Sequence, residues 1–252
     1  MIKRILYPAV LLLMGILIWE LAVRHMQVPH YILPAPSQIV KTLMLRQSLL
    51  IHHSFVTLEE IIVGFGLAFV VGVGLAFLMF QFPVLERTFY PMVIGSQTVP
   101  VFAIAPLLVL WFGYGLPSKV VMAALIVFFP IVVNTLDGLK CADPDAVNLL
   151  RILKANRWQI LWKVRVPSSL PFVFSGCKIG VSVSTIGAII GEWVGSNEGL
   201  GYLMLHANAQ MQISLIFASL LYLTALGVGL FYLVVLIERW AMPWKRLSEV
   251  GS

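Results

Sequence analysis

The sequence is poor in charged residues: Asp, Glu, Lys and Arg together make up 11% of its 252 residues, whereas hydrophobic residues make up 60%. Soluble globular domains have about 25% charged residues, so this composition excludes an ordinary soluble domain. The apolar stretches are roughly 20 residues long, which is the length of a membrane-spanning helix rather than of a barrel strand. We therefore expect an all-α polytopic membrane protein with a single transmembrane domain over residues 1–252.

The usual marks of enzymes and cofactor proteins are also missing. The two cysteines, Cys141 and Cys177, have no metal-ligand spacing and do not suggest a disulfide framework. No Gly-Lys-Ser or Gly-Lys-Thr of a phosphate-binding loop occurs anywhere in the chain. No nucleophile, base and orienting group form a credible set. The sequence predicts no catalytic residue, no metal site and no ATP hydrolysis by this chain.

Six membrane spans are predicted from the long apolar runs. They cover residues 5–23, 55–80, 92–112, 119–138, 170–192 and 213–237. Lys3 and Arg4 precede the first run as in a signal peptide, but no cleavage site of small residues follows, so we interpret it as a retained span. In the second span Gly64 and Gly72, and likewise Gly66 and Gly74, recur eight residues apart, which predicts close helix packing.

The basic residues predict the orientation of these spans. Twelve lysines and arginines fall in the N-terminus, the 81–90 loop, the 139–169 loop and the C-terminus. Four fall on the opposite side, and Lys178 lies within a span. Cytoplasmic loops carry the excess of positive charge, so we place both termini and the 139–169 loop in the cytoplasm. The net charge of +6 thus reflects topology and does not indicate nucleic-acid binding.

The segment 143–167 is the main polar interruption of the chain. Asp143 is a good N-cap residue and Pro144 suits the first helical position, so a helix is expected to begin here. Its apolar stripe consists of Leu149, Leu150 and Leu153. Asn156 can cap a second helix, which Pro167 is expected to end. The segment therefore predicts a water-exposed helical hairpin.

Two roles suit a leucine stripe with basic residues at its end. The stripe can bury itself in a groove of a partner protein, as an amphipathic helix does. Alternatively, the hairpin can lie on the inner leaflet of the lipid bilayer, held by anionic lipid. The physics of the sequence alone favours neither role.

One face of the fifth span is polar. Lys178, Ser182, Thr185 and Glu192 fall within roughly 80° of one another on a helix. Polar faces in a bilayer turn toward a cavity or a partner helix, so this face can line a substrate pathway with Glu192 near its outer gate. Alternatively, Lys178 and Glu192, about 21 Å apart along the axis, each extend to their own membrane interface. Gln97 and Asn134 are further pathway candidates, although a helix-to-helix hydrogen bond explains each of them equally simply.

Several motifs together resemble those of a known family. At the hairpin, Asn148-Leu149-Leu150, Lys154 and Val164-Arg165-Val166-Pro167 have the spacing of a signature that reads Glu-Ala-Ala, three residues, Gly, nine residues, Ile-x-Leu-Pro. Further matches lie in order at residues 33–37, 105–115, 128–138 and 191–202. The chain resembles the inner-membrane permease subunits of ATP-binding-cassette importers, in the six-span branch of taurine, alkanesulfonate, nitrate and thiamin-precursor permeases.

The resemblance implies a fold, partners and a location. The fold is a type I importer permease with six transmembrane helices and a cytoplasmic coupling-helix hairpin. The expected partners are a second copy of the chain, two cytoplasmic ATPase subunits and an extracytoplasmic binding protein, in the bacterial inner membrane. No cofactor is expected on this chain, since ATP and Mg belong to the ATPase. The coupling residues carried over to the hairpin are Asn148, Leu149, Leu150, Leu153, Lys154, Arg157 and Pro167.

Two positions depart from the signature, and the substrate is specified only weakly. Asn148 replaces the acid and Lys154 replaces the glycine, which in the family permits a left-handed turn between the helices. Lysine makes that turn costly, so a different turn remains open here. The 191–203 stretch is most similar to permeases for pyrimidine precursors of thiamin, with taurine, sulfonates, nitrate and riboflavin as alternatives. A secondary transporter driven by an ion gradient would require an inverted repeat and paired intramembrane charges, and neither is apparent.

Overall fold

A computed structural model gives the fold and describes residues 2–243. Within this range every regular element is a helix and no strand occurs. The chain divides into two compact units, Met1–Thr57 with Asn197–Thr224 and Leu58–Ser196 with Ala225–Ser252. The residues of two long helices, α3 (Gln47–Gln81) and α11 (Ile213–Ala241), are divided between the two units.

The first unit contains α1 (Ile2–His25) and α2 (Pro36–Leu45), joined by a polar contact. Pro36 begins α2, and the next backbone N–H, that of Ser37, needs an acceptor because no helical carbonyl precedes it. Glu20 of α1 supplies this acceptor: its carboxylate accepts hydrogen bonds from the Ser37 backbone at 2.9 Å and the Ser37 hydroxyl at 2.8 Å. The 33–37 motif thus fixes the start of α2 on α1.

Side chains of α3 cap the third short element of this unit, α10 (Leu200–Ala209). The N–H of Gly199 donates to Nδ1 of His53, and the N–H of Leu200 donates to the hydroxyl of Thr57, both at 2.9 Å. Both acceptors are buried on α3. The first two backbone donors of α10 are therefore satisfied by another helix rather than by a residue of their own loop.

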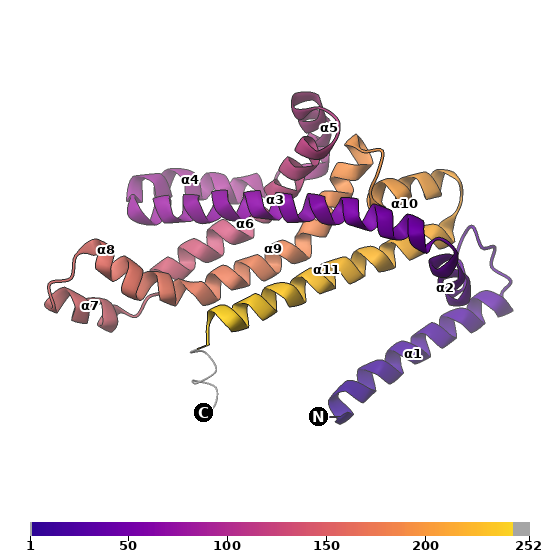
Figure 1. The fold of residues 1–252 in the computed structure, drawn as a ribbon, viewed down its shortest axis with the longest axis horizontal. Helices are drawn as coiled ribbons and strands as arrows, with labels where there is room; N and C mark the ends of the chain where they lie inside the picture. The colour runs from indigo at the N-terminus through magenta and orange to yellow at the C-terminus, as the bar shows by residue number, and fades with distance from the viewer. Residues whose placement is uncertain (1, 244–252) are drawn as a thin grey trace. The chain divides into compact units, whose positions relative to one another are not determined.

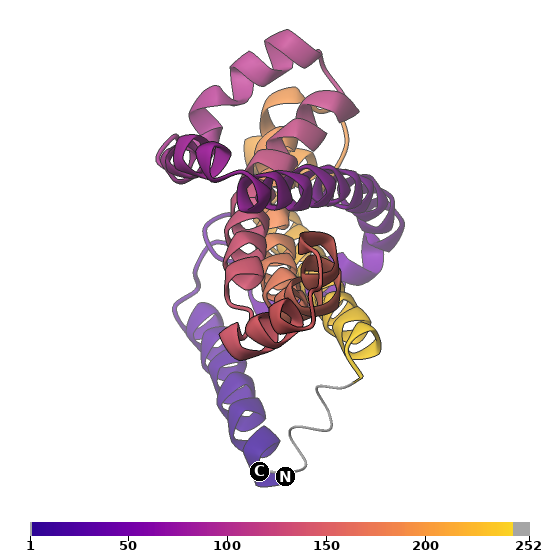
Figure 2. The same ribbon diagram turned by 90° about the vertical axis from the view of Figure 1, so that its left-hand side faces the viewer.

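The second unit is built on α6 (Leu116–Lys140) and α9 (Val166–Gly195), which run side by side (Figures 1 and 2). Small residues line the face of α9 that meets α6. A Cβ on Gly187 would lie 2.8 Å from the Cα of Ala123, and one on Gly176 would lie 2.8 Å from the Pro130 carbonyl. Side chains larger than hydrogen at these glycines would push the two backbones apart.

The close packing predicted for the glycines of the second span is confirmed at two of them. An added Cβ would meet Ala123 of α6 at Gly64 and Ile131 of α6 at Gly72. Gly66 and Gly74 have nothing within 4 Å. The face of α3 that carries Gly64 and Gly72 therefore packs on α6, whereas Gly66 and Gly74 take no part in this contact.

Four described helical stretches are long and apolar enough to cross a membrane. They are Gln47–Gln81, Leu116–Lys140, Arg157–Gly195 and Ile213–Ala241. A fifth span results if α4 (Pro83–Ser96) and α5 (Val101–Phe112), which are bent by 103° at a short break, are counted as one. These elements coincide with five of the six predicted spans, and the remaining predicted span, 5–23, falls within α1.

Two details of the predicted spans are wrong. The third span, predicted as one helix over 92–112, is broken after Ser96, and the 81–90 segment predicted as a loop is mostly helix. Pro83 explains the second difference, because proline at the first helical position gives up no hydrogen bond and α4 can begin there. Lys245 and Arg246, which contributed to the predicted orientation, lie outside the described residues.

Candidate functional site

The hairpin at the end of the α6–α9 pair forms as its capping residues predict (Figure 1). Its first helix, α7 (Pro144–Ile152), begins after Asp143, whose carboxylate accepts the N–H of Asp145 at 3.0 Å. Its second helix, α8 (Arg157–Ile160), has a capping box in which Asn156 and Gln159 exchange two hydrogen bonds of 2.8 Å. Both helix starts predicted from the sequence are confirmed.

The predicted end of the second hairpin helix at Pro167 is wrong. A π-helical turn, Leu161–Arg165, connects α8 directly to α9, and Pro167 lies in the first turn of α9. Proline is tolerated there because its missing N–H removes no necessary hydrogen bond. Arg165 holds this junction: its guanidinium donates to the Leu139 carbonyl at 2.9 Å and lies 4.9 Å from the centre of the Phe80 ring. The hairpin is therefore a helical extension of the spans.

The leucine stripe of α7 divides between two faces. Leu150 packs inward against a small buried cluster that includes Val147 and Ile160. Leu149 and Leu153 point outward, with 58% and 67% of their surface exposed. Ile152 is also outward-facing, with 78% of its surface exposed, so two apolar side chains of α7 and that of its C-cap residue Leu153 face outward.

Ile152 and Trp158 are members of this outer surface that the sequence analysis missed. Trp158 on α8 is 56% exposed. The signal for Ile152 was its place three residues after Leu149, which puts both on one helix face. Of the carried-over polar residues, Asn148 and Arg157 are exposed, and Asn148 accepts a long hydrogen bond of 3.5 Å from Arg151. The outer surface thus combines apolar side chains with basic neighbours.

Lys154 adopts the left-handed turn that a glycine would favour. Its φ is +58°, its N–H donates to the Arg151 carbonyl at 2.9 Å, and the N–H of Ala155 donates to the Leu150 carbonyl at 2.9 Å. These two bonds form the Schellman motif that ends many helices, normally with glycine at this position. The turn is retained despite the lysine, so the alternative of a different turn is wrong.

We expect Lys154→Gly to stabilise the hairpin, because glycine adopts positive φ without the steric cost of a Cβ. The gain is about 1 kcal/mol, which corresponds to roughly fivefold slower local opening. Hydrogen exchange of the Ala155 amide in the purified protein measures it. Lys154→Ala removes the same charge but keeps the Cβ, so equal slowing in both variants would contradict the conformational explanation.

The break between α4 and α5 places polar groups inside an apolar span. At residues 96–100 the hydroxyls of Ser96 and Thr98 each donate at 2.7 Å to a backbone carbonyl in the last turn of α4. The side-chain amide of Gln97 is exposed, and no described residue forms a hydrogen bond with it. Irregular backbone at membrane depth is tolerated only where it lines a polar cavity or is covered by protein. This break is therefore a candidate lining of a pathway.

Buried charges connect α3, α6 and α9. Lys119 forms an ion pair with Glu60 and donates to the hydroxyl of Ser196 at 2.9 Å. Glu192 is 1% exposed and lies close enough to interact electrostatically with Glu60. The alternative in which Glu192 extends to its own membrane interface is therefore wrong. Glu192 lies instead within a buried cluster shared by three helices.

Lys178 likewise has a partner that the sequence analysis did not identify. Its ammonium group forms an ion pair of 2.8 Å with Glu238 of α11. Thr185 lies on the same side, since its methyl group would be 3.2 Å from a Cβ added at Gly227 of α11. The polar face of α9 is thus partly covered by α11. The structure contains paired intramembrane charges that the sequence analysis did not find.

The remaining pathway candidates differ in exposure. Ser182 is exposed and donates to the Lys178 carbonyl of its own helix at 2.8 Å. Asn134 is half-buried, donates to the Pro130 carbonyl at 2.8 Å and faces Gly176 of α9. The structure therefore does not bring the six predicted pathway residues together on one surface.

A family model described as "Binding-protein-dependent transport system inner membrane component" matches residues 64–243. This stretch includes the broken helix, the hairpin, and Lys119 and Glu192 of the charge cluster. The chain belongs to this family. It is a permease subunit of an ATP-binding-cassette importer, a multi-pass inner-membrane protein that works with a separate ATPase and a substrate-binding protein.

Two similar proteins carry related names. A probable ABC transporter permease protein of Haemophilus influenzae is 43% identical over 91% of the permease and 94% of its own length. The formylaminopyrimidine transport permease protein ThiX of Halalkalibacterium halodurans is 41% identical over 96% of both chains. The solved MetNI methionine ABC transporter, in an inward-facing conformation, aligns over 77% of the permease and 96% of its own chain with a TM-score of 0.68. At 20% identity this likeness concerns the fold alone.

Proposed function

We propose that the permease imports a small uncharged heterocycle, with a formylaminopyrimidine as the leading candidate. The observation that carries this proposal is the pairing of the intramembrane lysines. Lys119 is bound to Glu60 and Lys178 to Glu238, while α3 and α5 contain no lysine or arginine. A sulfonate or nitrate ion crossing the bilayer needs compensating positive charge, since an unpaired charge in a low-dielectric interior is costly.

Neutral groups at the broken helix suit such a solute. The Gln97 amide offers one donor and one acceptor side by side, which matches the edge of an aminopyrimidine as it matches the edge of adenine. The first N–H groups of α5, which no helical carbonyl accepts, can bind an oxygen such as that of a formyl group. The relative named ThiX, 41% identical over nearly its whole length, supports this class of substrate.

A second copy of the permease is expected to complete the pathway. Beside the break, α5 exposes Phe102, Leu110 and Trp111 at 56%, 77% and 69%. Lipid could cover these apolar side chains, but it cannot satisfy the polar groups of the break itself. A homodimer places the two breaks on either side of a shared polar route, and rocking of the two copies would alternate its access.

The hairpin is proposed to dock on the ATPase. With the positive charges in the cytoplasm, the outer surface of the hairpin faces that compartment, as do both termini. Leu149, Ile152 and Leu153 present an apolar helix face suited to a groove, and the basic neighbours give electrostatic complementarity. Two permease copies would bind two ATPase subunits in this way, and the binding protein would deliver the substrate on the opposite side.

Uptake by reconstituted vesicles tests the substrate class. We expect ATP-dependent uptake of a labelled formylaminopyrimidine when the permease is combined with its ATPase and binding protein, and no competition by taurine or nitrate. Gln97→Ala should lower uptake about tenfold, because a lost hydrogen bond in a water-excluded site costs roughly 1–3 kcal/mol. Gln47→Ala removes an exposed amide of the same type outside the break and should leave uptake unchanged. Uptake of taurine in preference to the pyrimidine would overturn the proposal.

A further inference from the structure

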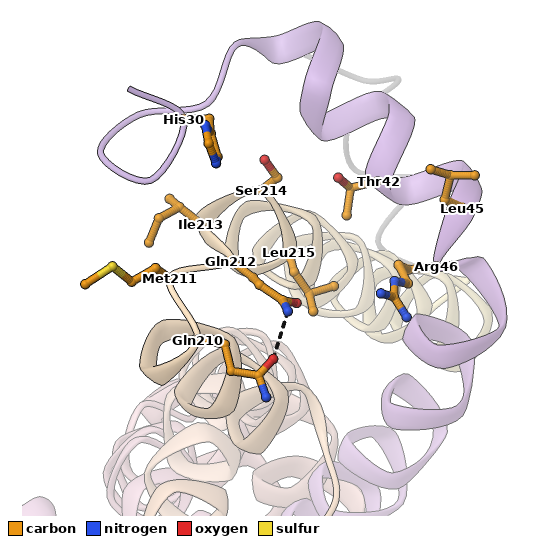
Figure 3. Close-up of a pocket in the computed structure, with 10 residues that line it drawn as sticks. All are labelled: His30, Thr42, Leu45, Arg46, Gln210, Met211, Gln212, Ile213, Ser214 and Leu215. Atoms are coloured by element: carbon orange, nitrogen blue, oxygen red, sulfur yellow. Dashed lines mark hydrogen bonds between the residues drawn. The ribbon is translucent and has the colours of Figure 1, made fainter. Parts of the chain in front are cut away.

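A cavity of about 360 Å³ is lined by residues of the first unit alone. Three segments form it: the loop after α1, the end of α2 with the residue that follows it, and the turn from α10 into α11 (Figure 3). Its polar lining consists of His30, Thr42, Arg46, Gln210, Gln212 and Ser214. In the proposed orientation these segments lie on the extracytoplasmic side of the membrane.

The cavity carries positive charge without a compensating acid. None of its ten lining residues is Asp or Glu, and Arg46 is the one lining residue that is always ionised. Among the residues that the structure describes, none forms a hydrogen bond or ion pair with the Arg46 guanidinium. In contrast, Arg24, also of this unit, is paired with Glu20 at 2.5 Å. Arg46 therefore holds an unused guanidinium at the wall of a cavity.

The opposite wall is held in one conformation by its own hydrogen bonds. The Gln212 amide donates to the Gln210 side-chain oxygen at 2.8 Å (Figure 3), and the Gln210 amide nitrogen lies 2.8 Å from Nε2 of His206. Met211 between them has a φ of +55°, a left-handed conformation that side chains other than glycine rarely adopt. Such strained positions persist only where the surrounding structure fixes them. The cavity is thus preformed on this side.

We propose that this cavity receives an aspartate or glutamate side chain of the extracytoplasmic binding protein, which Arg46 binds through its guanidinium. This inference rests on the proposed function, since it needs the binding protein as a partner. Arg forms bidentate pairs with carboxylates, and the absence of any acid in the lining makes the site complementary to one.

The rim of the cavity favours a protein as the source of the carboxylate. A free anion on one exposed guanidinium gains little in water, whereas a carboxylate held by a docked protein is supported by the rest of the interface. Leu45 and Met211, which line the cavity together with Arg46, are 72% and 67% exposed. Methionine and arginine are enriched in protein interfaces, so this surround fits a docking surface.

Binding of the purified binding protein to the permease–ATPase complex in lipid nanodiscs tests this inference. With the binding protein loaded with a formylaminopyrimidine, we expect Arg46→Glu to weaken its affinity at least about tenfold, because a paired charge becomes a like charge. Arg46→Lys should have a smaller effect, since it keeps the charge and loses only the bidentate geometry. Lys41→Glu is the matched control: Lys41 is an exposed cation of α2 outside the lining, and its reversal should change the affinity less than threefold.

Three results would overturn the inference. They are an unchanged affinity in Arg46→Glu, an equal loss in Lys41→Glu, and a loss of uptake while the affinity for the binding protein stays the same, which would make Arg46 a substrate contact. Basal ATP hydrolysis and thermal unfolding of Arg46→Glu should match those of the wild type. If the wild-type complex does not bind the binding protein at all, the proposed function fails instead, so the two failures are distinguishable.

Discussion

Replacing both Leu149 and Ile152 with aspartate is expected to abolish ATP-driven uptake while the permease still inserts into the membrane. These side chains are 58% and 78% exposed on α7, so their replacement disturbs no packing within the hairpin. In a docked complex they would be buried, and two carboxylates in an apolar groove would each carry a desolvation cost of several kcal/mol. Co-purification of the ATPase and ATP-dependent uptake in vesicles measure the loss.

Leu150 and the methionine variants provide the controls for this experiment. Leu149→Met with Ile152→Met keeps an apolar surface of similar volume and should retain uptake. Leu150→Asp places a charge in the small buried cluster around Val147 and Ile160. It should therefore unfold the hairpin locally and speed the hydrogen exchange of its backbone amides, an effect that the double aspartate variant should not show. Uptake that survives the double aspartate variant would mean that this surface is not the coupling element.

The local structure of the hairpin was largely predictable because its signals are short-range. Asp143 and Asn156 cap helices through bonds to residues two or three positions away, and such bonds depend on little else. Pro167 was misread because the same residue that ends one helix can also begin another, and the π-helical turn before it decides between the two. Lys154 shows the converse: the two backbone bonds of the turn outweigh the preference of lysine against positive φ.

The charge pairs could not be predicted, because they depend on which helices meet. Lys119 and Glu60 are separated by 59 positions, and Lys178 and Glu238 by 60. The helices of the first pair meet where Gly64 of α3 faces Ala123 of α6, and those of the second meet where Gly227 of α11 faces Thr185 of α9. The broken helix did have a signal: Pro100 disfavours a helical conformation at the residue before it. The hydropathy of the 92–112 run concealed this signal.

Removing the carboxylate of Glu60 is expected to have the largest effect on stability. Glu60→Ala breaks the buried ion pair with Lys119, and removing one partner of a buried pair costs about 3–5 kcal/mol in the free energy of unfolding. Denaturant unfolding of the purified permease in detergent measures this loss. Adding Lys119→Met to Glu60→Leu removes both charges of the pair and fills the space with apolar groups, while the carboxylate of Glu192 stays in the cluster, so part of the stability should return.

Glu86→Ala is the matched control for this prediction, because it breaks an exposed ion pair. The side chain of Glu86 is 31% exposed and that of its partner Lys140 is 44% exposed. An exposed pair contributes only about 0–1 kcal/mol, so the control should unfold almost as the wild type does. Similar losses in Glu60→Ala and Glu86→Ala would mean that the buried pair contributes no more than a surface one. The packing of α3, α6 and α9 would then depend on their glycine contacts alone, and the double variant would not regain free energy of unfolding.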